Sequence, residues 1–406
     1  MTGDVVLDLS RLLSRARHHT PSGVDRVEMA YARGLHARFG DRLHFAAVHP
    51  FGVYGRLSHA RTLAFLDATE ERWARVEVTT GPRPLPEILP TLLGLLPTPP
   101  RPNGRGVYVQ ASPHHLTRPA QMQRILKREQ ARFLCLVHDL IPIEYPEYAR
   151  PNGARLHRRR IATVTALADG IIVNSGATGE SLKPWLAATG RSVDVRIALL
   201  GTDVIATAAP SAAPSPAPSA VPAQPYFVCV GTIEPRKNHL LLLNLWRAMA
   251  HQSETGAIPR LIVIGRRGWE NEQVVDMLER CTALEGHVEE LNRCSDQHMH
   301  ALLRGARALL LPSFAEGYGM PITEALSVGT PVICSDLPAL REAGGAVPDF
   351  LDPLDGPGWA ACIRDHADNG PLHQAQLERM GGWSAPSWAD HMAVVCAAIA
   401  DLQRRP

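Results

Sequence analysis

Short apolar runs of strand length alternate with helical patterns along this chain, in two separate blocks. In the first block the runs lie at residues 3–10, 43–50, 106–112, 132–140 and 169–175, and a helix is predicted over 23–40. In the second block runs at 226–232, 260–266, 306–313 and 330–336 alternate with helices expected at about 238–251, 270–284, 296–305 and 320–328. This alternation is typical of a doubly wound parallel sheet, so we predict an α/β chain with two Rossmann-like domains facing across a cleft.

An Ala/Pro/Ser-rich segment separates the two blocks. Residues 205–224 read IATAAPSAAPSPAPSAVPAQ, a composition that cannot build a packed core. We therefore predict domains over 1–204 and 225–385 joined by this linker. The final residues, 386–406, predict an amphipathic closing helix, and periodicity alone fits either a helix of the second domain or one that crosses back to the first domain.

Composition excludes several classes of protein. Hydrophobic residues make up 45% and charged residues 20%, as in soluble globular chains, and no run approaches the ~18–20 apolar residues of a membrane span. The first residues, MTGDVVLDLS, lack a basic head before an apolar core, so we expect no secretory signal. The seven cysteines form no C-x-x-C pair, which favours free thiols in a reducing cytoplasm over disulfides or a zinc site.

Charge is distributed unevenly along the chain. Residues 1–204 carry 27 Lys and Arg against 18 Asp and Glu, a net charge of +9, whereas residues 205–406 carry 15 against 22, a net charge of −7. A basic half indicates either an anionic partner, such as a phospholipid surface, a pyrophosphate or nucleic acid, or a plain surface bias. The densest basic cluster is Arg155, Arg158, Arg159 and Arg160.

The segment SFAEGYGMPITEAL at 313–326 places two glutamates, Glu316 and Glu324, around a glycine-rich loop. It follows a predicted strand, and Pro321 suits the start of a helix. Glycines permit close backbone approach, and the amides of a helix start favour a phosphate. Carboxylates on either side suit the hydroxyl pairs of a sugar and a ribose. The alternative is a helix-capping Glu324 and a solvated Glu316.

The stretch VCVGTIEPRKNH at 228–239 ends another strand and presents Arg236 and Lys237. Two cations at a strand end neutralise a leaving diphosphate as its charge develops, although such a pair also occurs as solvated surface. Only three lysines occur in the chain, Lys127, Lys183 and Lys237.

At this point the chain resembles glycosyltransferase family 4, retaining enzymes of GT-B fold. The segments that carry the likeness are GTIEPRKNH, LIVIGRRGW at 261–269 and residues 306–345, which contain the E-x7-E signature. The resemblance implies that Glu324 binds ribose, that Glu316 binds the transferred sugar, and that Arg236, Lys237 and the amides of Gly317, Tyr318, Gly319 and Met320 hold the diphosphate. Thr232, also assigned to substrate, stands where many members carry arginine.

The first block matches this family more loosely. LVHDLIPIEYPEY at 136–148 resembles the family's acceptor-domain His segment, which implies a catalytic role near the transferred sugar for His138. TPSGVDRVE at 20–28 resembles the glycine turn that faces the donor phosphates, implying that Gly23 and Arg26 bind substrate. The family's last helix crosses back to the first domain. A lone histidine is more often a packing residue, and Arg26 is equally well a surface charge.

No D-x-D pair occurs in the chain, so we predict no metal and no cofactor besides the nucleotide-sugar substrate. The resemblance points to enzymes that add mannose or rhamnose to bacterial polysaccharides. GDP-mannose is the first donor that we expect, and UDP-sugars and dTDP-rhamnose are the alternative donors. We expect a saccharide or lipid-linked acceptor, no nucleic acid, and a cytoplasmic protein at the inner membrane face. The alternatives are a sugar-nucleotide epimerase, a phosphorylase, or a non-catalytic nucleotide-sugar-binding subunit.

Overall fold

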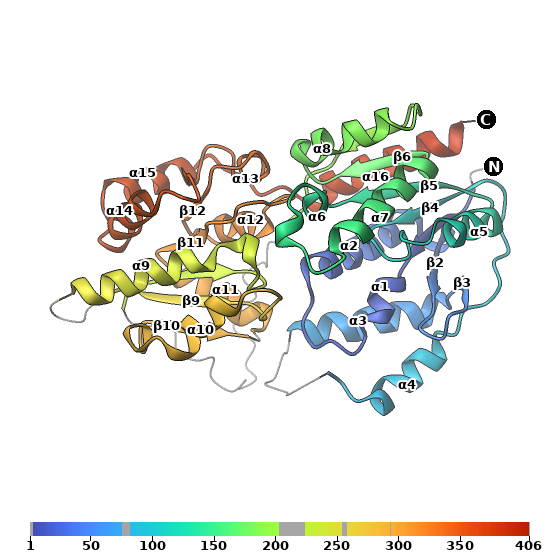
Figure 1. The fold of residues 1–406 in the computed structure, drawn as a ribbon. Coiled ribbons are helices and arrows are strands. Elements are labelled where there is room, and N and C mark those ends of the chain that lie inside the picture. The colour runs from blue at the N-terminus through green and yellow to red at the C-terminus, as the bar shows by residue number, and fades with distance from the viewer. Residues whose placement is uncertain (1–2, 75–81, 203–223, 254–257, 293, 406) are drawn as a thin grey trace. The chain divides into compact units, whose positions relative to one another are not determined.

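The computed structural model describes residues 3–74, 82–202, 224–253, 258–292 and 294–405. It divides into two compact units, unit 1 with residues 1–201 and 387–406, and unit 2 with residues 202–386. All but the last residue of the predicted linker lies outside the described residues. Each unit is a sheet flanked by helices (Figure 1).

Unit 1 contains a seven-stranded sheet in the order β3-β2-β1-β4-β5-β6-β7, parallel except for the antiparallel edge strand β3. Its strands are β1 (Val5–Asp8), β2 (Leu43–Val48), β3 (Tyr54–Arg56), β4 (Gly106–Gln110), β5 (Ala131–Val137), β6 (Gly170–Val173) and β7 (Asp194–Ile197). The central strands are buried on both sides, as a parallel sheet covered by helices requires.

The sheet of unit 2 is wholly parallel and has the order β10-β9-β8-β11-β12-β13. Its strands are β8 (Tyr226–Val230), β9 (Arg260–Ile264), β10 (Val288–Leu291), β11 (Ala308–Leu311), β12 (Val332–Ser335) and β13 (Asp349–Leu351). Every strand predicted in this block is present. Strands β10 and β13 were not predicted, because their half-buried sequences VEEL and DFL are short and carry charge.

Helices alternate with the strands in both units. Those of unit 1 are α1 (Ser10–Ser14), α2 (Gly23–Phe39), α3 (His59–Ala74), α4 (Leu85–Gly94), α5 (Pro119–Glu129), α6 (Ile141–Glu144), α7 (Gly153–Leu167), α8 (Gly176–Ala187) and α16 (Trp388–Arg404). Those of unit 2 are α9 (His239–Gln252), α10 (Glu272–Arg280), α11 (Asp296–Gly305), α12 (Met320–Ser327), α13 (Pro338–Gly344), α14 (Gly356–Ala367) and α15 (Pro371–Met380). Short 3-10 turns lie at η1 (Gly40–Arg42), η2 (Pro146–Tyr148), η3 (Pro235–Lys237) and η4 (Thr282–Leu284).

The last helix, α16, packs in unit 1 against α2 and strands β4 to β7, although it follows unit 2 in sequence. His391 anchors it, because its ring nitrogens contact the Tyr31 hydroxyl at 2.9 Å and the Ala198 carbonyl at 3.1 Å. Among the described residues, no helix has the length and apolar character needed to span a membrane. All seven cysteines are free thiols.

Candidate active site

The candidate site of unit 2 lies where two central strands end. Strands β8 and β11 are neighbours, but the chain leaves β8 toward β9 on one side of the sheet and leaves β11 toward β12 on the other. Such a switch point leaves a crevice beyond the carboxyl ends of the strands, the usual ligand site of this architecture. The loops at 231–238 and 312–319 follow these two strands.

The loop after β8 is shaped around a lysine. Gly231 has a φ of +147°, and a Cβ placed there would lie 3.2 Å from Cε of Lys237. The turn η3 then brings Arg236 and Lys237 together. Thr232, one residue after the glycine, is exposed.

Glu316 joins the two loops through both of its carboxylate oxygens. Oε1 lies 2.5 Å from Nζ of Lys237 and accepts a 2.7 Å hydrogen bond from Oγ of Ser313, while Oε2 lies 2.8 Å from Nη1 of Arg236. The guanidinium also pairs with Glu234, with Nε 2.5 Å from Oε1. The side chains of Lys237 and Glu316 are only 9% and 8% exposed. The structure thus brings three predicted site residues into direct contact.

These contacts fix the charge of Glu316. Burial raises the pKa of its carboxyl, but Arg236 and Lys237 more than offset that effect and hold the pKa at about 2. The pKa of Glu234 is raised, chiefly by burial. Both cations are therefore held at the switch point by an ionised Glu316. Glu234 and Ser313 were not predicted as site residues, although each lies within three residues of one that was.

The loop after Glu316 leads into helix α12. Gly319 has a φ of +117°, and a Cβ there would approach Cδ2 of Leu340 to 2.7 Å, so glycine is required both by conformation and by space. It forms the N-cap of α12, which has proline in its first turn and no side-chain cap. Met320 begins the helix, and Glu324 lies half-buried just beyond its first turn. Gly317 and the buried Tyr318 complete the loop.

The remaining predicted residues belong to unit 1. Gly23 is the exposed first residue of α2, whose start is closed by a capping box of Ser22 and Asp25. Asp25 pairs at 2.7 Å with both Arg11 and Arg15, and the half-buried Arg26 follows it. The glycine turn is therefore bordered by a paired carboxylate and several arginines.

His138 follows the last residue of β5, at the carboxyl end of the sheet. Its Nε2 lies 2.7 Å from the carbonyl oxygen of Ala111 and donates to it, which leaves Nδ1 as the acceptor nitrogen of the neutral ring. Burial lowers the pKa of His138, so the ring is neutral at physiological pH. The Asp139 carboxylate accepts from the backbone amide of Ile141 at 3.1 Å, which is a local capping role.

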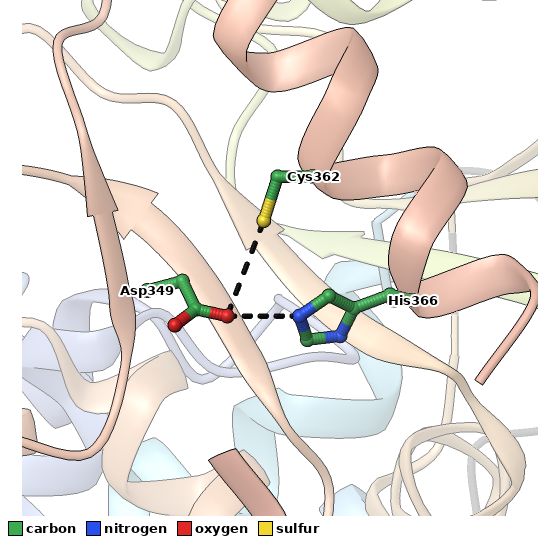
Figure 2. A group of neighbouring side chains, drawn as sticks. All are labelled: Asp349, Cys362 and His366. Atoms are coloured by element: carbon green, nitrogen blue, oxygen red, sulfur yellow. Dashed lines mark hydrogen bonds and ion pairs between the residues drawn. The ribbon is translucent and has the colours of Figure 1, made fainter. Parts of the chain in front are cut away.

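A second cluster, Asp349, Cys362 and His366, lies between β13 and α14 (Figure 2). Its potential ligand atoms lie within 4.8 Å of one another. Oδ2 of Asp349 contacts Nε2 of His366 at 2.9 Å, and Oδ1 contacts Nη2 of Arg379 at 2.5 Å. Burial, reinforced by Asp349 and Asp365, raises the pKa of the Cys362 thiol to about 12. Because Arg379 occupies the Asp349 carboxylate and the Cys362 thiol keeps its proton, we interpret the cluster as a structural hydrogen-bonded group and not as a metal centre.

Solved structures define the class of fold. Across 98% of both chains, sucrose-phosphate synthase from Thermosynechococcus elongatus matches with a TM-score of 0.61 at 17% identity. Alr3699/HepE from Anabaena, solved in complex with UDP, matches over 99% of this chain and 100% of that one, with a TM-score of 0.59 at 16% identity. The chain therefore has the predicted GT-B fold, with two Rossmann-like units.

Sequence comparison identifies similar proteins. Residues 215–345 match the model described as glycosyl transferases group 1. The O-antigen chain mannosyltransferase B of Escherichia coli is 31% identical over 225 residues, which is 55% of this chain and 58% of the relative. The O-antigen chain mannosyltransferase RfbU of Salmonella typhimurium is 32% identical over 34% of this chain and 38% of its own. The chain thus spans little more than half the length of the first relative.

Residues 215–345 thus match the group 1 glycosyltransferases, within a chain that has the GT-B fold and sequence similarity to mannosyltransferases. The predicted resemblance is confirmed. The roles of individual site residues remain predictions.

Proposed function

We propose that this protein is a retaining glycosyltransferase that moves a hexose from a nucleotide-diphosphate sugar to a saccharide or a lipid-linked oligosaccharide during bacterial surface polysaccharide synthesis. The observation that carries the proposal is the contact of Glu316 with Arg236 and Lys237 at the switch point of unit 2. GDP-mannose is the first donor we expect, because the similar proteins of Escherichia coli and Salmonella typhimurium are O-antigen mannosyltransferases.

The donor diphosphate would lie over the amides of residues 317–320, beside Arg236 and Lys237. Oxygens of Glu316 would accept hydrogen bonds from hydroxyls of the transferred sugar, and Glu324 would accept from the ribose. As the glycosidic bond breaks, negative charge grows on the diphosphate, and the fixed cations gain interaction at that moment. Because Glu316 already orients both cations, little reorganisation accompanies this charge development.

Unit 1 would supply the other side of the reaction. The neutral His138 ring, oriented by Ala111, offers Nδ1 as an acceptor for a hydroxyl of the sugar. Gly23 permits backbone approach to the phosphates, and Arg26 adds a cation. In the retaining reaction, the departing phosphate would take the proton of the acceptor hydroxyl on the same face of the sugar. Protein cations and amides would replace a metal, and the protein would act at the inner face of the cytoplasmic membrane.

A donor panel tests the proposal. The full chain is incubated with GDP-, UDP-, dTDP- and ADP-sugars, with and without saccharide acceptors, and nucleotide release is measured. We expect release with one nucleotide class and faster release with acceptor. Nucleotide binding without release would instead indicate a non-catalytic subunit, and conversion of the sugar nucleotide without acceptor would indicate an epimerase. A pyridoxal absorbance near ~330–420 nm would indicate a phosphorylase.

A further inference from the structure

A cavity of about 750 Å³ lies in unit 1 between α3, α4 and the segment after α1. Its volume falls within the ~300–1,000 Å³ typical of small-molecule sites. Ala16 and His19 line it from the segment that leads into the Gly23 turn. None of the predicted site residues lines this cavity, so it is separate from the groups discussed above.

Every Lys, Arg, Asp or Glu among the described residues that line the cavity is an arginine. Arg61, Arg72 and Arg83 line it, and no carboxylate is present among the described lining residues. The Arg61 guanidinium donates to the Gly94 carbonyl at 2.9 Å, and Nη1 of Arg83 donates to the Ala16 carbonyl at 3.4 Å. These contacts with neutral oxygens position the guanidinium groups without neutralising them. Arg83 also lies 3.6 Å from Glu87, whose side chain is 55% exposed and does not line the cavity.

Arg72 is the most informative of the three arginines. Its Nη2 donates to Oγ1 of Thr69 at 3.2 Å, but its buried Nε has no partner among the described residues. Burial, together with the like charge of Arg83, lowers the pKa of Arg72 to about 10. A half-buried cation that lies beside a second cation, and has no counter-ion among the residues that the structure describes, is costly unless a ligand supplies the negative charge.

The rest of the described wall is mostly apolar. Phe65 of α3 and Ile88 of α4 line it with three alanines and Leu95, beside the polar His19, Thr69 and Thr91. Large apolar side chains are also exposed on this helix and just after it, since Leu85 and Leu93 of α4 and Leu96 beyond its end are 51%, 49% and 48% exposed. Glu87 is the only charged residue within this helix. An apolar helix edge beside a cationic cavity suits one amphiphilic molecule, with a hydrocarbon chain at the edge and an anionic head inside.

We propose that this cavity binds a diphosphate attached to a long hydrocarbon chain, and that it holds the lipid carrier of the saccharide acceptor. The inference rests on the proposed function, and it names the acceptor class and the place where its carrier is bound. Arg72 and Arg83 pair with the diphosphate. Phe65, Ile88 and the exposed Leu93 of α4 contact the first carbons of the chain.

Isothermal calorimetry on the full chain tests this with farnesyl diphosphate, inorganic pyrophosphate and farnesol as separate probes below their aggregation limits. Farnesyl diphosphate should bind at least about tenfold more tightly than either of the other two, because only it engages both the cations and the apolar wall. Equal affinity for pyrophosphate would reduce the cavity to a simple anion site, and equal affinity for farnesol would remove the arginines from it. Either result overturns the proposal.

Two variants locate the binding. Arg72→Gln should weaken farnesyl diphosphate binding about tenfold or more, and Ala68→Trp, at an exposed position of the wall, should block it by filling space. Arg128→Gln on α5 removes an exposed arginine outside the cavity and should leave the affinity unchanged. Unfolding temperatures of all variants are compared to verify folding. Normal binding by both cavity variants would place the lipid elsewhere.

Calorimetry measures binding and needs no turnover, so its result does not depend on the result of the donor panel. If the full chain releases nucleotide but does not bind farnesyl diphosphate, this inference alone is overturned. Lipid binding without nucleotide release from any donor would overturn the proposed function alone.

Discussion

The central strands of the two units follow the same order, but the units differ in the surroundings of a buried carboxyl group. In unit 2, both oxygens of Glu316 are paired with cations, and the carboxyl stays ionised. In unit 1, Glu28 of α2 is fully buried and neither oxygen has a partner among the described residues. Similar sheets therefore accommodate different electrostatic surroundings, a network of ion pairs around Glu316 in unit 2 and a buried carboxyl without a hydrogen-bond partner among the described residues of unit 1.

The environment of Glu28 explains the difference. Burial raises the pKa of its carboxyl well above the ordinary value, and the nearby Asp8 and Asp25 raise it further. Asp8, at the end of β1, also has a raised pKa, chiefly because of burial. Asp25 differs, since burial is offset by Arg11 and Arg15 and its pKa is lowered. A carboxylate thus serves as an anchor for cations only where the fold brings the cations to it.

The largest expected effect is at Lys237. We predict that Lys237→Ala lowers kcat by about 10²–10³-fold, with a smaller loss of donor affinity, because the ammonium acts as diphosphate charge grows. Lys237→Arg should still be impaired about tenfold or more, because a planar guanidinium is larger than the ammonium that packs beside Gly231 and presents its donors in a different geometry. Steady-state kinetics of nucleotide release measure both. Near-normal turnover of the alanine variant would remove Lys237 from the reaction.

Substitutions of Glu316 and Glu324 should affect different steps, sugar transfer for Glu316 and nucleotide binding for Glu324. Glu316→Gln is expected to slow transfer by about tenfold or more while free nucleoside diphosphate binds as well as before or better, because the cations lose their competing carboxylate. Glu324→Ala should weaken binding of the free nucleotide by about tenfold, because its proposed partner is the ribose. Calorimetry with turnover assays distinguishes them, and the exposed Glu378→Ala serves as control. Equal losses of nucleotide affinity would contradict the assignment.

Glu28→Gln tests whether ionisation of the buried Glu28 carboxyl lowers the stability of unit 1. A raised folded-state pKa means that the stabilising contribution is full below the unfolded value of 4.5 and is lost as pH rises through the folded pKa. The glutamine variant has no such loss, so it should be more stable than the parent at pH 8, by roughly 1–3 kcal/mol, and closer to it at pH 4. Calorimetric unfolding at both pH values measures this.

Glu129 supplies the matched comparison for that experiment. Its carboxylate is equally buried but accepts from Arg56 at 2.8 Å and from the Tyr54 hydroxyl at 2.6 Å. Glu129→Gln should therefore destabilise unit 1, the opposite sign from Glu28→Gln. The same sign for both variants would show that pairing does not determine the stability of buried carboxylates in this unit.

The smallest expected effect is that of chelation. Excess EDTA should leave nucleotide release and the unfolding temperature unchanged, because the proposed diphosphate ligands are protein cations and amides, and Asp349 is engaged by Arg379 and His366. Activity lost to EDTA and restored by Mg²⁺ or Mn²⁺ would contradict the metal-independent mechanism. A lower unfolding temperature alone would point to a metal at the Asp349 cluster.

Several features followed from the sequence. The apolar runs predicted the parallel strands that form the centres of both sheets. Glu316 and Lys237 could be assigned to the ends of neighbouring strands, because parallel strands place their carboxyl ends at one edge. Pro321 and the run after it predicted α12, and the glycine before it marked a backbone conformation that other residues rarely adopt. All of these are local signals, carried within a few residues.

Tertiary structure decided what depends on distant contacts. Arg160 is contiguous in sequence with Arg158 and Arg159, yet it alone of the three is half-buried, and burial and the like charge of Arg11 lower its pKa. Helix α16 has a periodicity compatible with either unit, and its place in unit 1 is fixed by His391 against Tyr31, 360 residues away. The ion pairs of Glu316 with Arg236 and Lys237 likewise depend on the contact between the loops at 231–238 and 312–319, which are distant in sequence. Periodicity specifies which face of an element is buried, whereas only the folded chain specifies what that face is buried against.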